Sequence, residues 1–395
     1  MPTVTRDTVE EFWDTETLIR CYENASQVDA KDFLNRLKSF LGASGQMWAT
    51  HSARFALQQF LCDVVSHEKR FVLVCSFNCQ VVADAVTKAG FEVETFDLAE
   101  VTGQIDWPLI AKKLKQHHGA LVIPHLFGVP NDFRPVKEVA EELGVWIIED
   151  CAPTLGGKIG DCMAGTLGDA AIFSFNYDKP ISLGGGGALL VNNPDLWSKI
   201  RLPQKSSDFD SEAQELELFT AYLQIRRKRI SRPWITLSDR IFGYIKRRIW
   251  SPQVKEPFPV SGIGPLRSAL GIWQLNGYPE IIIQRNNNAS FFAHEECRSW
   301  FVGPTVTPAW LKQKVFPDKV TDIGRISQRL QSQGLRVGLF NWPITIDGYL
   351  GRTEKPNAHY TARHCLDIPI HQKMMPNELE VIRNAVCSEN FNELY

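Results

Sequence analysis

The chain has 395 residues, 44% hydrophobic and 22% charged, an ordinary composition for a globular protein with two domains or one large α/β domain. Its formal net charge of −2 excludes a general electrostatic attraction to nucleic acid. No apolar run approaches the ~20 residues needed to cross a bilayer, and residues 1–11 are polar and acidic, unlike a signal peptide, so we expect a cytoplasmic protein.

The first half of the chain alternates short β-rich runs with helical patterns. Buried strands are predicted where apolar and β-branched residues run together, and helices where apolar residues recur at helical spacing. In chain order these are a helix at 55–64, strand 70–75, helix 80–89, strand 91–96, helix 107–117, strand 120–124, helix 135–143 and strand 145–148. Strands separated by helices favour a parallel, helix-covered sheet, in which ligands bind beyond the carboxyl ends of the strands.

The second half of the chain has a different character. Two strands at 170–175 and 188–191 enclose four consecutive glycines, and an acidic helical stretch then precedes a basic, aromatic stretch. A linker at 251–265 and a helix at 266–284 follow, and residues 286–297 are a possible extension of this helix. The last predicted elements are strands at 335–339 and 366–370 and a helix at 377–386. We expect an α/β fold with a large domain over 1–255, carrying a basic aromatic insertion at about 205–255, and a linking helix with a small C-terminal α+β domain over 256–395.

Nine cysteines are scattered along the sequence, and no two of them form a CxxC pair. Neither a zinc ribbon nor a disulfide framework is therefore expected. Cys75 and Cys79 lie four positions apart where a predicted strand meets a turn, which is weak support for a metal site. We expect no metal.

The main chemical signal is Lys179, which follows the strand at 170–175 and precedes the glycines 184–187. Upstream, the strand at 145–148 ends in the acids Glu149 and Asp150. Pyridoxal phosphate (PLP) chemistry requires a lysine that forms a Schiff base with the cofactor aldehyde and an acid that keeps the pyridinium nitrogen protonated. Lys179 and Asp150 are the candidates for these catalytic roles. Glu149 is expected to be structural because adjacent strand residues point to opposite faces.

A phosphate group would need backbone N–H groups at a helix N-terminus, together with hydroxyl or cationic donors. Ser52, Ala53 and Arg54 open the predicted helix at 55–64 and suit this role, since Ala53 is small enough for close approach. The alternative is an ordinary N-cap serine followed by a solvated arginine. Ser174 would supply a further hydroxyl.

Seven segments together resemble the DegT/DnrJ/StrS family of PLP-dependent sugar aminotransferases, which have the fold type I architecture. They occur in the family's order and span roughly residues 30 to 390: THSARFAL (50–57), VLVCSFNCQVVADAV (72–86), HLFGVP (125–130), VWIIEDCAPTLGG (145–157), GDAAIFSFNYDKPISLGGGGALL (168–190), LRSALGIWQL (266–275) and DIPI (367–370). The resemblance implies that Lys179 forms the Schiff base, that Asp150 contacts the pyridinium, and that Ser174 and 52–54 bind phosphate. It also implies a homodimer with shared active sites and a reaction that moves an amino group from glutamate onto a keto group of a nucleotide-linked sugar.

Several positions depart from the family pattern. Arg54 stands where the family commonly has a threonine, and Pro153 stands where it has a glutamine. Cys79 stands where the family has an aromatic residue that stacks on the cofactor, and Phe77 is a candidate to take over this stacking. Residues 260–265 lack the asparagine that reaches the partner subunit's phosphate, and Arg54 is a candidate to compensate by a charge-assisted contact.

Two questions stay open at this level. Residues 225–250 combine arginines with aromatics, which favours either a basic insertion at the dimer interface or a weak contact with a membrane surface. The function is predicted as nucleotide-sugar transamination, with transamination of a non-sugar ketone or a non-catalytic binding or regulatory role as alternatives. Dehydratases of the family carry histidine in place of the lysine, and Lys179 argues against that reaction.

Overall fold

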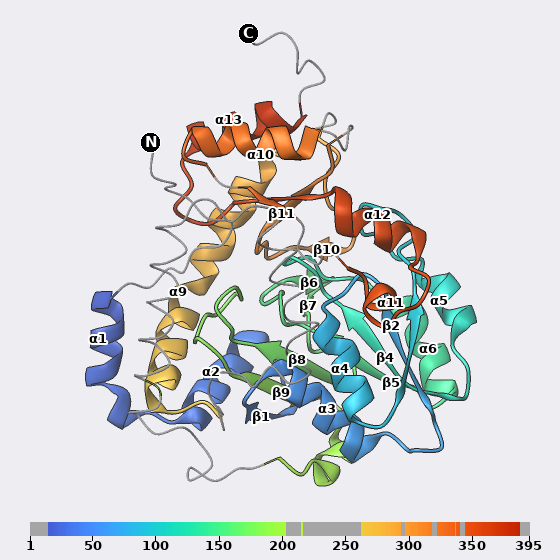
Figure 1. Ribbon diagram of the computed structural model, residues 1–395. Helices are drawn as coiled ribbons and strands as arrows, with labels where there is room; N and C mark the ends of the chain where they lie inside the picture. Colours follow the sequence, from blue (N-terminus) through green and yellow to red (C-terminus); the bar gives the residue numbers. More distant parts are fainter. Residues whose placement is uncertain are drawn as a thin grey trace.

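A seven-stranded sheet forms the centre of the computed structural model, which describes residues 15–202, 215, 262–293, 297–317, 322–335, 337–339 and 344–387. The strand order is β1-β9-β8-β5-β4-β2-β3 (Figure 1). The neighbouring pairs among β8, β5, β4, β2 and β3 are parallel, whereas β9 runs antiparallel to both β8 and β1. The strand bounds are β1 Gln46–Thr50, β2 Phe71–Cys75, β3 Glu92–Phe96, β4 His118–Pro124, β5 Trp146–Asp150, β8 Ala170–Ser174 and β9 Gly187–Val191.

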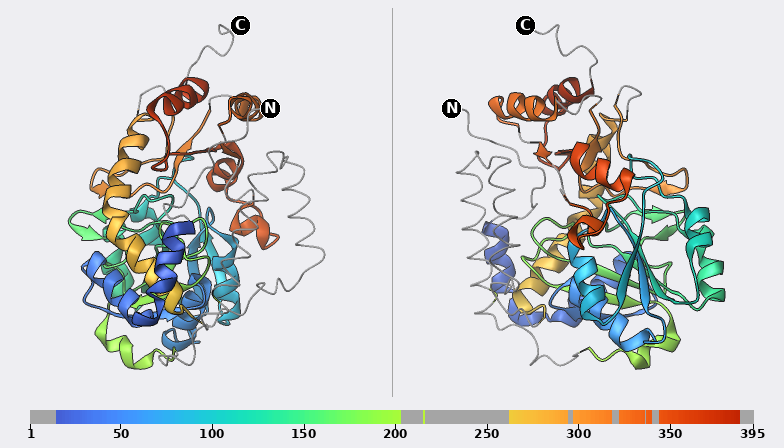
Figure 2. Two further views of the ribbon diagram at one scale, coloured as in Figure 1. Left: turned by 90° about the vertical axis from the view of Figure 1, so that its left-hand side faces the viewer. Right: turned by 45° about the vertical axis from the view of Figure 1, so that its right-hand side comes forward.

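Helices cover both faces of this sheet. Alternate residues of β2 show why: Val72 and Val74 join the apolar cluster under α3 and α4, whereas Leu73 and Cys75 join the cluster under α5 and α6. At the β8–β9 end, α2 and α9 pack on the α5/α6 face, and α1 lies against α9 (Figure 2). The bounds are α1 Thr15–Glu23, α2 Ala30–Leu41, α3 Ala53–Val64, α4 Gln80–Lys88, α5 Trp107–Lys113, α6 Arg134–Glu142 and α9 Pro265–Ser290.

The C-terminal part forms a second, three-stranded sheet above the first, and α9 runs from one to the other (Figure 1). Its elements are β11 Gln313–Val315, α10 Asp322–Ser332, β12 Gly338–Leu339, α11 Ile346–Tyr349, α12 Pro356–His364, β13 Leu366–Ile368 and α13 Pro376–Cys387. One apolar cluster contains both Leu73 of β2 and Leu366 of β13, so the two parts share a continuous core. The remaining short strands, β6 Lys158–Ile159, β7 Cys162–Met163 and β10 Val306–Thr307, form a third sheet.

The predicted strands of the first half and the mostly parallel sheet are confirmed, with bounds that differ by one or two residues. The helix at 266–284 and part of its extension form the single helix α9. Strand β1, which pairs with β9 and leads into α3, was not among the predicted strands. Residues 225–250 lie outside the described residues, and the division at residue 255 stays a prediction.

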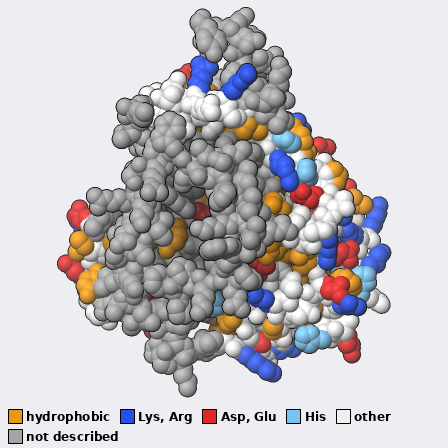
Figure 3. Space-filling model, viewed as in Figure 1, with side chains coloured by type: hydrophobic (Ala, Val, Ile, Leu, Met, Phe, Trp, Pro, Cys, Tyr) orange, Lys and Arg blue, Asp and Glu red, His pale blue; other side chains and the backbone are white. Residues whose placement is uncertain are grey.

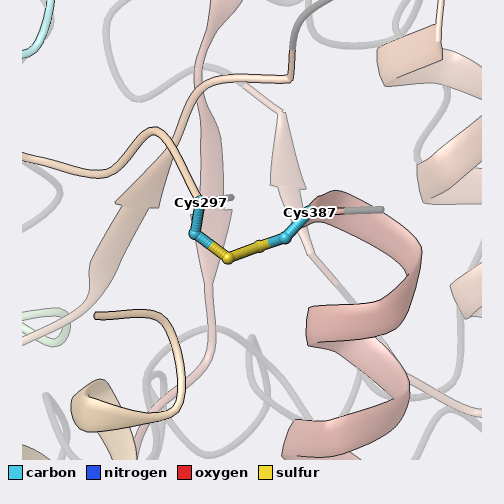
Figure 4. The surroundings of a disulfide bond; sticks show 2 residues. All are labelled: Cys297 and Cys387. Carbon is cyan, nitrogen blue, oxygen red and sulfur yellow. A yellow bond between two sulfur atoms is a disulfide. The ribbon is translucent and has the colours of Figure 1, made fainter. Parts of the chain in front are cut away.

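One disulfide corrects the expectation drawn from the scattered cysteines. Cys297 and Cys387, 90 residues apart, are bonded with a Cα–Cα distance of 4.8 Å, and they join the segment after α9 to the end of α13 (Figure 4). The other seven cysteines are free. A pair this far apart carries no local spacing signal, because only the fold brings its members together.

The surface and the helices bear on possible partners. On the face drawn in Figure 3, lysines and arginines are interspersed with aspartates and glutamates over the described part of the surface. Among the described helices, none is both long enough and apolar enough to pass through a bilayer.

Candidate functional site

Asp150 is the last residue of β5 and lies at the carboxyl edge of the sheet, only 4% exposed. Its Oδ1 accepts a hydrogen bond from the Ala152 N–H (3.1 Å), and its Oδ2 accepts a long one from the Asn78 amide (3.5 Å). Burial raises the pKa of Asp150, and the Ala152 N–H, the Lys179 ammonium and Asn78 offset this only in part. The ionisation of the Asp150 carboxyl group therefore depends on the positive charges and hydrogen-bond donors beside it.

Lys179 lies in the turn after β8, with a side chain 20% exposed. The Nζ of Lys179 lies 3.7 Å from Oδ1 of Asp178. The backbone N–H of Lys179 donates a hydrogen bond to the Asn176 carbonyl (3.2 Å). Burial lowers the pKa of Lys179, but Asp178, Cys79 and Asp150 together raise it above the ordinary value. The structure thus brings Lys179 within electrostatic reach of Asp150 and holds the amine protonated at neutral pH.

The glycines after Lys179 form a turn that other residues do not adopt readily. Gly184, Gly185 and Gly186 have φ values of +74°, +155° and +91°. Gly187 is required for a different reason: a Cβ there would lie 2.4 Å from the Ala53 nitrogen and 2.8 Å from the Phe173 oxygen. The start of α3 therefore lies directly against β9.

The predicted phosphate-binding residues meet at this contact. Ser52 forms a bridge with Gly186, and Ser174 of β8 pairs with Gly187 of β9, so Ser52, Ala53 and Ser174 border the same glycines. Ser52 is also the N-cap of α3, with its Oγ accepting from the Phe55 N–H (3.2 Å). The N-cap interpretation of Ser52 is thus realised, and Arg54 lies half-buried in the first turn. A helix N-terminus with small residues and two serines is a suitable phosphate site.

Phe77 does not fit the stacking role predicted for it. Its ring is 1% exposed and packs against Trp300 and Phe127, with centroids 5.8 and 6.2 Å away. The neighbouring Asn78 is the residue of this turn that contacts Asp150. Successive side chains near a strand end point in opposite directions, so Phe77 points into the core while Asn78 points toward Asp150.

His125 and Glu149 form a structural pair in the core. His125 accepts from the Asn131 N–H at Nδ1 (3.0 Å), so its Nε2 carries the proton and donates to Glu149 (2.8 Å). Glu149 also accepts from the N–H groups of Gly165, Leu167 and Gly168. These bonds confirm that Glu149 is a structural acid.

Arg267, at the start of α9, was not predicted as a residue of the site. It is fully buried, its Nε donates to Glu215 (2.7 Å), and its Nη2 donates to the Gly262 carbonyl. A Cβ on Gly186 would lie 3.6 Å from its Nη1. The LRSALG segment, one of the seven that resemble the family, therefore packs against the glycine turn.

A model of the DegT/DnrJ/EryC1/StrS aminotransferase family matches residues 6–217, more than half of the 395 residues. The chain belongs to this family. The family is PLP-dependent, which confirms the predicted enzyme class and cofactor. The groups described above fit that cofactor, since they combine a buried acid, a lysine and a donor-rich helix N-terminus.

Individual relatives are distant. The UDP-4-amino-4,6-dideoxy-N-acetyl-beta-L-altrosamine transaminase of Campylobacter jejuni is 22% identical over 335 residues, covering 81% of this chain and 79% of that protein. The structure of PseC from Helicobacter pylori, an aminotransferase involved in the biosynthesis of pseudoaminic acid, has a TM-score of 0.74 at 16% identity and covers 96% of this chain and 97% of that one. These matches confirm the fold type I architecture.

A GDP-4-keto-6-deoxymannose-3-dehydratase is similar to nearly the same degree, with a TM-score of 0.69 at 16% identity, covering 96% of this chain and 99% of that one. The fold alone therefore does not separate an aminotransferase from a dehydratase. That distinction depends on the residues of the site.

Proposed function

We propose that this aminotransferase moves an amino group from glutamate onto a keto group of a nucleotide-linked sugar. The observation that carries the proposal is the convergence of Lys179 and Asp150 at the carboxyl edge of the sheet, beside the Ser52–Gly187 contact. The names of distant relatives, which include transaminases of UDP- and dTDP-linked amino sugars, support a nucleotide sugar as the acceptor.

The residues have separate tasks in this proposal. Bound PLP supplies an electron sink that stabilises negative charge on the substrate carbon. Asp150 keeps the ring nitrogen protonated, while Ser52, Ala53, Arg54 and Ser174 bind the phosphate. Lys179 holds the cofactor and then moves a proton at the substrate carbon. Asp178 and Asp150 raise the pKa of Lys179. Once Asp150 pairs with a cationic ring, its charge would raise the pKa of Lys179 less. The free amine that the chemistry needs would then be favoured.

Arg54 is assigned a compensating role at the phosphate, in place of the asparagine that residues 260–265 lack. A charge-assisted hydrogen bond contributes about 1.5–3 kcal/mol, so Arg54→Ala should weaken PLP binding by about tenfold or more. The measurement is a fluorescence titration of the apoprotein with PLP. An unchanged affinity would show that Arg54 plays no part in phosphate binding.

Two alternatives differ from the proposal in what they predict. A non-sugar ketone as acceptor leaves the glutamate half of the reaction unchanged, whereas a non-catalytic binding protein binds PLP without converting it. The presence of Lys179, Asp150 and Ser174 disfavours the second. By the family resemblance we also assign a homodimer that completes each site from the neighbouring subunit.

The test has two stages. Holoprotein is first mixed with glutamate, and conversion of the cofactor to pyridoxamine phosphate is followed by absorbance, with Lys179→Ala as the inactive control. The converted enzyme is then offered keto sugars linked to UDP, GDP or dTDP and, separately, α-keto acids and simple ketones. Return of the original absorbance with a nucleotide keto sugar supports the proposal. Return only with non-sugar ketones, or no conversion in the first stage, rejects it.

A further inference from the structure

A buried polar cluster connects the C-terminal part of the chain to the end of strand β2. Asp347 of α11, 3% exposed, accepts hydrogen bonds from the Ser76 hydroxyl at Oδ2 (2.6 Å) and from the Thr95 hydroxyl at Oδ1 (2.7 Å). The neighbouring Ile346 N–H donates to the Ser76 carbonyl (2.9 Å). Ser76 is thus held by α11 through both its side chain and its backbone.

The cluster is built to keep a carboxylate buried. Ser76 is 0% and Thr95 5% exposed, so water contributes little to solvating Asp347. A buried carboxylate is tolerated only where hydrogen bonds replace its hydration, and bonds to a charged acceptor are about twice as strong as neutral ones. Ser76 is further fixed by its N–H, which donates to the Phe96 carbonyl of β3 (2.8 Å).

The segment that follows Ser76 leads directly to the candidate site. Phe77 is buried against Phe127 and Trp300, Asn78 donates to Asp150 (3.5 Å), and Cys79 lies where the charges of Lys179 and Asp150 act on it. The Asn78 amide also accepts from the Cys79 N–H (2.6 Å). A displacement of Ser76 would therefore move the group that contacts Asp150.

We propose that Asp347 is a positioning residue of the aminotransferase site, which acts through Ser76 to hold residues 76–79 against Asp150 and Lys179. This inference rests on the proposed roles of Asp150 and Lys179. Asp347 is 197 positions from Asp150 in the sequence and does not touch the site. The C-terminal part would nevertheless help to position the residues of that site.

The test compares four holoproteins: wild type, Asp347→Asn, Ser76→Ala and Thr361→Val. Thr361 is the matched control, because it is also buried (0% exposed) and its hydroxyl donates to the Val101 carbonyl (2.7 Å) across the same two parts without reaching residues 76–79. The readouts are the dissociation constant for PLP, the pH midpoint of the visible absorbance band, and thermal unfolding.

Asp347→Asn and Ser76→Ala should each weaken PLP binding by up to about tenfold, the limit reached if the free energy of this hydrogen bond to a charged group is used entirely to position the site. Each should also shift the pH midpoint of the absorbance band, because the hydrogen bond from Asn78 lowers the pKa of Asp150. A fifth protein, which combines Asp347→Asn with Ser76→Ala, should bind PLP no more weakly than the weaker-binding single variant, since both changes remove the same hydrogen bond between Ser76 and Asp347. Thr361→Val should change thermal stability alone.

Wild-type affinity and midpoint in Asp347→Asn and Ser76→Ala, or equal shifts in Thr361→Val, would overturn the positioning role. If Asp347→Asn does not fold, Ser76→Ala decides the matter. A wild-type protein that forms no lysine-linked chromophore would instead refute the proposed function, so the two failures are distinguishable.

Discussion

Gly187→Ala is a direct test of the contact between β9 and the start of α3. The added Cβ would lie 2.4 Å from the Ala53 nitrogen and 2.6 Å from the Ser52 carbonyl carbon. Ordinary contact begins at 3.4 Å, so the turn at Ser52 must retreat by about 1 Å. Both neighbours are backbone atoms of a buried junction and cannot move aside as a flexible side chain would.

Two consequences of this displacement can be calculated. Overpacking of this kind costs about 1–3 kcal/mol of unfolding free energy. A hydrogen bond lengthened by about 1 Å is effectively lost, and one bond to a phosphate contributes about 1.5–3 kcal/mol. The affinity for PLP should therefore fall by about tenfold to a hundredfold.

Denaturant unfolding and fluorescence titration with PLP measure the two effects on the same protein. Gly324→Ala in α10 is the matched control: the same methyl group there would meet nothing within 4 Å. This change should leave PLP affinity unaltered and unfolding free energy equal or up to about 1 kcal/mol higher. If Gly187→Ala binds PLP as the wild type does, the start of α3 is not the phosphate site.

Three further predictions concern stability. Cys297→Ser should lower the unfolding free energy by about 4–5 kcal/mol under oxidising conditions, and the difference from wild type should disappear in reductant; a persistent difference would show that the bond is not formed. Glu149→Gln should cost about 2–4 kcal/mol in a urea titration, because an amide N–H would face backbone donors, and an unchanged midpoint would contradict the structural role. Burial would raise the pKa of Glu354, but hydrogen bonds from Arg363 and Thr345 bring it to about 2. The stability that Glu354 contributes should be complete above about pH 4.5 and lost as the pH falls toward 2, so wild type and Glu354→Gln should differ at pH 7 and converge at pH 2.

Much of the parallel sheet could be predicted from local signals. A buried parallel strand is a continuous apolar run, and each of β2, β4 and β5 has one, with a polar residue at its carboxyl end. Lys179 and Asp150 were recognisable because PLP chemistry requires those residue types beside strand ends and glycines. Strand β1 was missed because its five residues, Gln46–Thr50, mix polar and apolar side chains.

The contacts between distant segments could not be predicted in this way. Asp347 and Ser76 are 271 positions apart, and nothing in either neighbourhood points to the other. Phe77 was a candidate for the stacking role because Cys79 stands where the family has an aromatic residue, but the direction of the Phe77 side chain is set by packing on Trp300. The disulfide between Cys297 and Cys387 depends equally on how α13 folds back.

The central claim is that Lys179 bears the cofactor while Asp150 sets the charge of its ring. The most direct measurement is to add PLP to the purified protein, reduce it with borohydride and locate the pyridoxyl group by peptide mass spectrometry. We expect one labelled peptide, carrying the group on Lys179, and no stable label in Lys179→Arg. A label on another lysine, or a protein that never turns yellow, would contradict it.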